Sequence, residues 1–117
     1  MLDQHLADEL ALYTVNDSGL YNRCRCCALN LARKHKRGIY DPERAVTLFT
    51  HVISDAATQY RREFGPIGRL SRDTKRAAAA DLRERFEDEI QELLEKLNAG
   101  AKITQSDVVL NHFIRDI

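Results

Sequence analysis

Cysteines at positions 24, 26 and 27 are the residues whose type and spacing most suggest chemistry. Cys24 and Cys27 have the C-x-x-C spacing found in redox motifs and zinc sites. A redox motif of this kind follows a strand, and a structural zinc needs a second close ligand pair, whereas the four histidines stand singly along the chain. We therefore expect Cys24 and Cys27 to be buried and unliganded, with Cys26 more exposed. No metal and no cofactor are assigned.

Ser54, His51 and Asp55 offer the residue types of a hydrolytic triad on one predicted helix. Side chains of a single helix project roughly in parallel, whereas a triad needs converging side chains and an oxyanion hole. The sequence also has no nucleophile elbow, P-loop, dinucleotide-binding glycine motif, H-E-x-x-H or EF-hand loop. We therefore assign no catalytic residue and interpret His51 and Asp55 as a surface pair that supports its helix.

Basic residues are concentrated in residues 20–44, which contain seven bases and only two acids. Cations near a helix C-terminus are favoured by the helix dipole for a purely structural reason. The chain also has a formal net charge of zero, whereas phosphate-binding domains usually carry net positive charge. Nucleic-acid binding is therefore an alternative function. Its candidate residues are Arg23, Arg25, Arg33, Lys34, Lys36, Arg37, Arg61 and Arg62.

A helix predicted over residues 42–64 is the element against which the others should pack. Asp41 suits the N-cap, Pro42 the first helical position, and Gly65 followed by Pro66 the stop. The apolar stripe of this helix is too wide for one partner helix, so we expect other helices on both sides. The stripe consists of Ala45, Val46, Leu48, Phe49, Val52, Ile53, Ala56, Ala57, Tyr60 and Phe64.

Apolar periodicity and capping signals predict four further helices, over residues 2–14, 19–37, 72–98 and 105–115. The first of them is amphipathic, with Leu2, Leu6, Leu10 and Tyr13 along its apolar face and its acids outward. Gly38 ends the second, and the short connection to residue 42 makes it an antiparallel neighbour of the helix over 42–64. We therefore predict an all-α fold: a single domain over residues 1–117 that forms a bundle of four or five helices, with one long helix and a short C-terminal helix.

The long helix over residues 72–98 also suggests self-association. It would span about 40 Å, whereas a domain of this size has a radius of gyration of only about 13–14 Å. Its apolar residues exceed one seam, and the chain end is apolar too, so a dimer is expected first and a tetramer second. The expected interface comprises Leu82, Phe86, Ile90, Leu93, Leu94, Leu97, Leu110, Phe113 and Ile114.

Three stretches resemble a group of small helical proteins from phages and mobile gene cassettes. They are Leu20-Tyr21, the turn at 36–43 (Lys-Arg-Gly-Ile-Tyr-Asp-Pro-Glu) and residues 56–65 (Ala-Ala-Thr-Gln-Tyr-Arg-Arg-Glu-Phe-Gly). The resemblance covers residues 20–90 and leaves the cysteine cluster outside its pattern. That group has no assigned activity, so the resemblance implies a mobile-element origin and a helical fold, without a mechanism.

Composition narrows the function further. Apolar residues make up 44% and charged residues 31% of the chain, which is usual for a globular protein. The longest apolar run is too short for a membrane span, and the acidic N-terminus argues against a signal peptide, so we expect no membrane and a cytoplasmic location. We predict a small non-enzymatic protein that self-associates and binds a host macromolecule, such as a host protein. An enzyme, with its pocket between subunits, ranks third after nucleic-acid binding.

Overall fold

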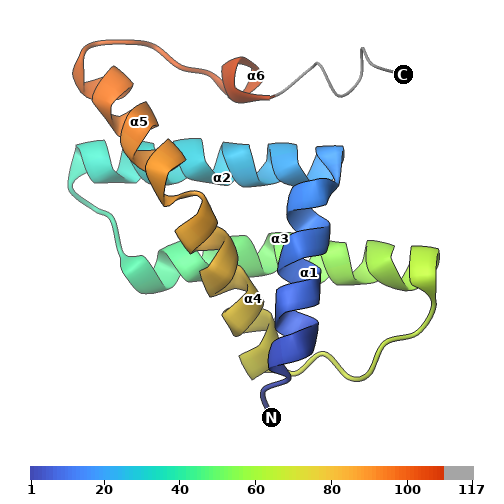
Figure 1. Ribbon diagram of the computed structural model, residues 1–117. Helices are drawn as coiled ribbons and strands as arrows, with labels where there is room; N and C mark the ends of the chain where they lie inside the picture. The colour runs from blue at the N-terminus through green and yellow to red at the C-terminus, as the bar shows by residue number, and fades with distance from the viewer. Residues whose placement is uncertain (110–117) are drawn as a thin grey trace.

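A computed structural model describes residues 1–109, and these residues form helices and loops without a strand (Figure 1). The predicted all-α class is therefore confirmed for the described part of the chain. The helices expected over residues 2–14, 19–37 and 42–64 are present to within two residues at each end. The elements are α1 (Gln4–Asn16), α2 (Ser18–Arg37), α3 (Pro42–Phe64), α4 (Arg72–Arg85), α5 (Glu87–Asn98) and α6 (Gln105–Val108).

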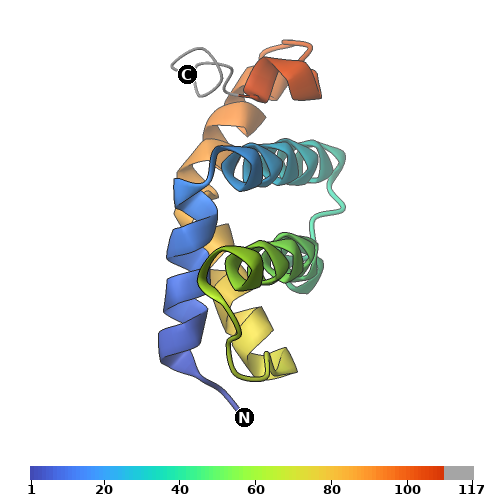
Figure 2. The same ribbon diagram turned by 90° about the vertical axis from the view of Figure 1, so that its right-hand side faces the viewer.

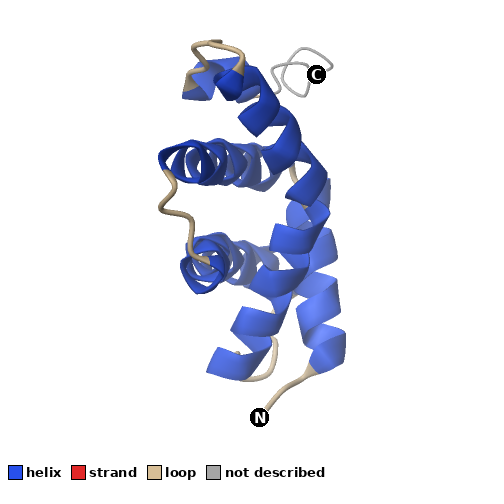
Figure 3. Cartoon of the chain, turned by 90° about the vertical axis from the view of Figure 1, so that its left-hand side faces the viewer, coloured by secondary structure: helices blue, strands red, loops and turns tan. Residues whose placement is uncertain are grey.

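Helices α2 and α3 form the antiparallel hairpin that the short connection predicts. Gly38 ends α2 with a positive φ of 74°, and Asp41 caps α3 by accepting a hydrogen bond from the backbone N–H of Glu43. Helices α1, α4 and α5 lie on one side of this hairpin, as Figures 2 and 3 show from opposite directions. The most extensive packing is that of α4 on α3 and of α5 on α2.

The predicted helix over residues 72–98 is wrong in one respect, because it is bent at Phe86 into α4 and α5. Phe86 has φ −98° and ψ 6°, outside the helical range, although its N–H still bonds to the carbonyl of Leu82 at 3.1 Å. Its buried ring lies 5.4 Å from Tyr21 of α2 and 6.1 Å from Phe49 of α3, measured between ring centroids. The bend therefore lets the two halves cover two different helices.

This arrangement corrects the interface assignment. Five of its residues are at most 7% exposed within one chain, so they complete the core and are not available to a second subunit. They are Leu82, Phe86, Ile90, Leu93 and Leu97. Leu94 is half-buried, whereas Leu110, Phe113 and Ile114 lie outside the described residues, as does most of the helix expected over 105–115. Self-association itself stays a prediction.

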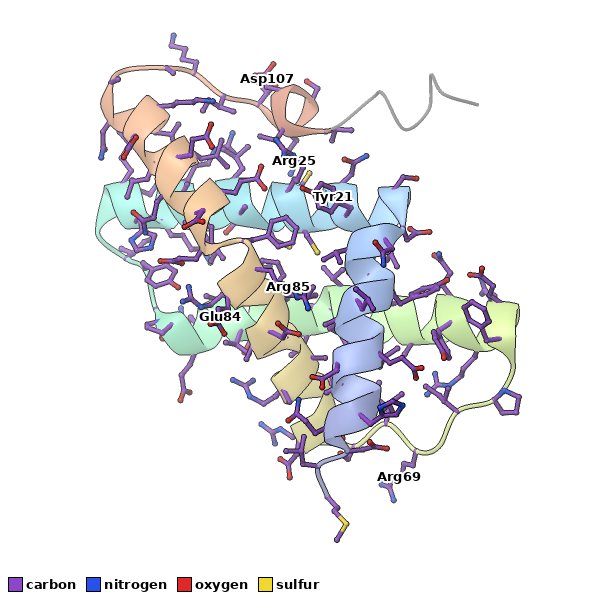
Figure 4. All side chains as sticks on the ribbon, viewed as in Figure 1. Tyr21, Arg25, Arg69, Glu84, Arg85 and Asp107 are labelled. Carbon is purple, nitrogen blue, oxygen red and sulfur yellow. The ribbon has the colours of Figure 1, made fainter. Side chains whose placement is uncertain are left out.

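Three bases of α2 fasten the end of the described chain. The guanidinium of Arg25 pairs with Glu89 of α5 at 2.6 Å and donates to the backbone carbonyl of Val108. Arg33 donates to the carbonyl of Ile103 at 2.6 Å, and Lys36 to the carbonyl of Leu97 at 3.0 Å. We call residues 99–109 the C-terminal strap. Figure 4 shows Arg25 between α2 and α6, and these contacts hold the strap and α5 against α2.

Glu89 is not an ordinary surface carboxylate. Burial raises its pKa, and the positive charge of Arg25 only partly offsets that effect. The Arg25–Glu89 pair therefore fastens α5 while the desolvation of Glu89 opposes it. Within the described residues, no helix combines the length and apolarity needed to cross a lipid bilayer.

Replacing Leu93 by Ala should test whether this residue belongs to the single-chain core. We expect the free energy of unfolding to fall by about 2–5 kcal/mol, because the change removes buried methyl groups and leaves a cavity. Urea unfolding at two protein concentrations is the measurement, and the variant's midpoint should not depend on concentration. Leu12→Ala is the control, since Leu12 is 51% exposed on α1. A folded Leu93→Ala variant that changes from dimer to monomer would restore the interface assignment.

The Arg25–Glu89 pair should respond unequally to loss of its two partners. Arg25→Met leaves Glu89 without its counter-charge and frees the carbonyl of Val108, so we expect the free energy of unfolding to fall by about 2 kcal/mol. Glu89→Gln removes a carboxylate that burial disfavours while keeping an oxygen acceptor, so its effect should stay below about 1 kcal/mol. Urea unfolding at pH 7 measures both. Equal losses for the two variants would contradict the assigned cost of burying Glu89.

Candidate docking surface

Three aromatic side chains meet where α1 crosses the end of α3. Tyr60 and Phe64 stand one turn apart on α3, and Tyr13 reaches them from α1. The ring centroids of Tyr13 and Tyr60 are 5.3 Å apart, those of Tyr60 and Phe64 4.9 Å, and those of Tyr13 and Phe64 6.1 Å. Both contacts of Tyr13 are edge-to-face, a favourable geometry for aromatic pairs. The three rings therefore hold one another in a defined arrangement.

This aromatic cluster is open to solvent on one side. Phe64 is 63% exposed and Leu12 is 51% exposed, although both are large and apolar. They line a shallow hollow of about 360 Å³ together with Tyr13, Tyr60, Glu9 and Asn16. We call these six residues the aromatic patch. In the described chain the other exposed large apolar residues are the terminal Met1 and Leu2 and the loop residue Ile39. The patch therefore differs from them in combining exposed apolar side chains with an aromatic cluster around a hollow.

Carboxylates border the rings of the patch. The phenol of Tyr13 donates a hydrogen bond to Oε2 of Glu63 at 2.7 Å. Partial burial raises the pKa of Tyr13, and the hydrogen bond and charge of Glu63 raise it further. Partial burial also raises the pKa of Tyr60, with a further contribution from Glu9 of α1. Both phenols therefore stay neutral at physiological pH beside negative charge.

Sequence reasoning missed this site because its residues have helical core spacing. Tyr60 and Phe64 fall on the predicted stripe of residues 42–64, and Tyr13 on that of residues 2–14. The stripe is buried from Phe49 to Ala57, but α3 then extends past the helix that covers it, as Figure 1 shows. One feature of the sequence could have indicated its exposure: Phe64 is the last residue of its helix, directly before the Gly65-Pro66 stop.

The eight candidate phosphate-binding residues do not form one face. Arg25, Arg33 and Lys36 are engaged with α5 and the strap, and Arg23 forms an ion pair with Asp55 of α3. Lys34 and Arg37 lie at the C-terminal end of α2, whereas Arg61 and Arg62 lie at the C-terminal end of α3. Because the hairpin is antiparallel, these two pairs are at opposite ends of the hairpin (Figure 1).

The predicted pairing of His51 with Asp55 is also corrected, since the partner of Asp55 in the structure is Arg23, on the other helix of the hairpin. His51 is exposed on α3. The Arg23–Asp55 ion pair joins α2 to α3 in the N-terminal half of α2. Asp55 therefore supports the hairpin rather than its own helix.

The cysteines behave as packing residues. Cys24 is fully buried, as predicted. Cys27 is only half-buried, so its predicted burial was wrong. It lines a hollow of about 420 Å³ together with Leu48 of α3 and with Gln105 and Val109 of the strap. Cys26 is half-buried in the same hollow. Burial raises the pKa of Cys24 to about 12 and that of Cys27 to about 11. Both thiols therefore stay protonated near neutral pH, which makes them poor nucleophiles and metal ligands.

Two further observations concern chemistry in the described residues. Across residues 1–109, His, Cys, Asp and Glu side chains form no group that could hold a metal ion. A hollow of about 650 Å³ is a shallow trough between the start of α3 and α4, and its lining includes Val46, Ala77 and Ala80. Its charged lining residues are Glu43, Asp73 and Arg76, and Arg76 is engaged with the hydroxyl of Thr47 at 3.3 Å. The lining contains no cysteine, histidine or serine that could act as a nucleophile.

Alkaline pH should destabilise the protein through Cys24. In the unfolded chain its thiol titrates near the ordinary value of 9.0, whereas in the folded chain it stays protonated up to about 12. Unfolding therefore releases a proton between these values, and stability falls as pH rises through that window. Urea unfolding at pH 8 and pH 10 should show a loss larger by about 1 kcal/mol in the wild type than in Cys24→Ala. Cys26→Ala, as control, should keep the wild-type dependence; an unchanged dependence in Cys24→Ala would contradict this assignment.

Comparison with known proteins gives no indication of the function of this chain. No family model, no curated protein and no solved structure matches this chain. The resemblance to phage and cassette proteins accordingly stays a prediction. The described residues form a helical scaffold with an exposed aromatic patch at the junction of α1 and α3.

Proposed function

We propose that this protein is a non-enzymatic interaction module and that the aromatic patch is its docking point for a partner protein. The exposed ring of Phe64, held against Tyr13 and Tyr60, carries the proposal. Aromatic side chains are enriched among residues that dominate binding energy at protein interfaces. Rings held in place before binding also lose little conformational entropy when a partner arrives.

The polar chemistry of the described residues supports a binding role. Arg25 of α2 is half-buried and bonds to Glu89 and to the carbonyl of Val108, and the exposed Lys36 bonds to the carbonyl of Leu97, so both bases serve the fold. The thiols of Cys24 and Cys27 are held protonated by burial. These groups stabilise the structure, and none of them faces the patch.

A protein partner is favoured over a nucleic acid. Exposed rings can stack on bases, but such sites combine the rings with a basic groove that follows the phosphates. At the patch, the charged side chains that interact with the phenols are the acids Glu63, on Tyr13, and Glu9, on Tyr60. Phosphates would be repelled there, whereas peptide side chains would not.

Two predictions from the sequence extend this proposal. A host protein would be the natural partner if the mobile-element origin is correct. A homodimer, if it forms, needs a surface other than the buried seam of α4 and α5, such as the residues around the half-buried Leu94. Light scattering across the micromolar range measures this association separately from partner binding.

A random twelve-residue peptide library displayed on phage tests the docking surface. We expect clones selected on the wild type to bind Phe64→Ser at least about tenfold more weakly, because loss of an exposed anchor ring typically costs an interface more than 1 kcal/mol. Both proteins should remain equally stable, since Phe64 is mostly outside the core.

Ile39→Ser is the matched control for this selection. Ile39 is 58% exposed in the turn between α2 and α3, remote from the patch, so its replacement removes a similar exposed apolar side chain. Clones that bind both variants as tightly as the wild type, or an absence of enriched clones, would contradict the patch as a docking point.

A further inference from the structure

The acids around the aromatic patch come from both of its helices. Glu63 of α3 accepts the hydrogen bond of Tyr13, and Glu9 of α1 lines the hollow beside Tyr60. Each carboxylate can accept further hydrogen bonds, since an ionised carboxylate has about four acceptor positions. Residues 1–19 as a whole carry four acids and no base. The rings therefore lie in a negative environment.

Neighbouring bases do not cancel this charge within the hollow. Arg61 and Arg62 are adjacent to Glu63 in sequence, and successive helical residues are rotated by about 100°. Arg62 therefore projects away from the face that carries Tyr60 and Phe64, whereas Arg61 flanks that face on the side opposite Glu63. Neither arginine lines the hollow, whereas Glu9 does. The chemistry at the patch is thus ring faces bordered by carboxylates.

We propose, on the basis of the function proposed above, that the aromatic patch recognises a cationic side chain of its partner protein, with arginine preferred over lysine. A planar guanidinium stacks on aromatic rings and at the same time donates hydrogen bonds to a carboxylate. The exposed face of Phe64 supplies the stacking surface, and Glu9 and Glu63 supply the acceptors. Arginine is preferred because its fork of donors suits two acceptors better than an ammonium group does.

Other occupants fit this chemistry less well. A purely apolar side chain would take Glu9 and Glu63 out of water without replacing their hydrogen bonds, which is unfavourable. A second copy packed patch to patch would follow two-fold symmetry, so two patches with the same acidic residues would be brought together. Like charges brought together at an interface oppose association. A positively charged partner removes both difficulties.

Nuclear magnetic resonance titration with two matched dipeptides tests the inference. The probes are acetyl-arginyl-leucine amide and acetyl-citrullyl-leucine amide, which differ by a positive charge but have nearly the same shape. We expect the ring resonances of Tyr60 and Phe64 to shift saturably with the arginine probe and at least about fivefold more weakly with the citrulline probe, as expected for a cation over aromatic rings. Added salt should reduce the binding of the arginine probe.

Charge-neutral variants connect the preference to particular carboxylates. In Glu9→Gln combined with Glu63→Gln, affinity for the arginine probe should fall to that of the citrulline probe, while Tyr13 keeps an oxygen acceptor at position 63. Asp8→Asn is the control, because it removes the same charge from α1 at a residue that does not line the hollow.

The outcomes separate this inference from the proposed function. Equal ring shifts with both probes, or a double variant that binds like the wild type, would overturn cation recognition, and so would an absence of ring shifts with either probe. The phage selection decides the docking surface independently. Clones that depend on Phe64 but contain no arginine or lysine would uphold the docking surface and reject its preference for a cation.

Discussion

The buried ring of Phe86 is the contact on which the arrangement of this protein depends. It lies against Tyr21 of α2 and Phe49 of α3, at the point where the chain turns from α4 into α5. A straight helix over the same residues would span about 40 Å and could follow only one line across the hairpin. The bend lets one continuous segment cover α3 with its first half and α2 with its second (Figure 1). One chain thus completes its own core with apolar residues that were predicted to contact a second subunit.

Structural features that depend on residues adjacent in sequence were predicted correctly. Gly38, Asp41 and Pro42 determine the hairpin turn by themselves, because a positive φ, an N-cap and a first-turn proline are local requirements. The bend was missed because residues 81–90 are good helix formers joined by ion pairs such as Asp81–Arg85 and Arg83–Glu87. Tertiary packing around Phe86 overrides that local preference. No residue next to Phe86 in sequence indicates this packing.

The basic residues were misinterpreted for a related reason. Arg33 and Lys36 donate to backbone carbonyls of residues far along the chain, and every residue has such a carbonyl. A charge pattern reveals the donors but never these acceptors. Likewise, the aromatic residues at 13, 60 and 64 have the spacing of a core stripe, and their exposure depends on where α1 crosses α3. Sequence periodicity identifies a face of a helix, but whether a neighbour covers that face is a property of the assembled fold.

The zero net charge conceals a division between structural and exposed charges. Arg25 and Lys36 of α2 are engaged with Glu89 and with backbone carbonyls, so part of the positive charge stabilises the fold. The acids beside the aromatic patch are Glu9 and Glu63, and both remain accessible at its hollow or its edge. Long-range fields from a neutral chain are weak, so steering of a partner would be short-ranged. Recognition at the patch would therefore depend on contact geometry, in which a few ordered rings and carboxylates select one side chain after the encounter.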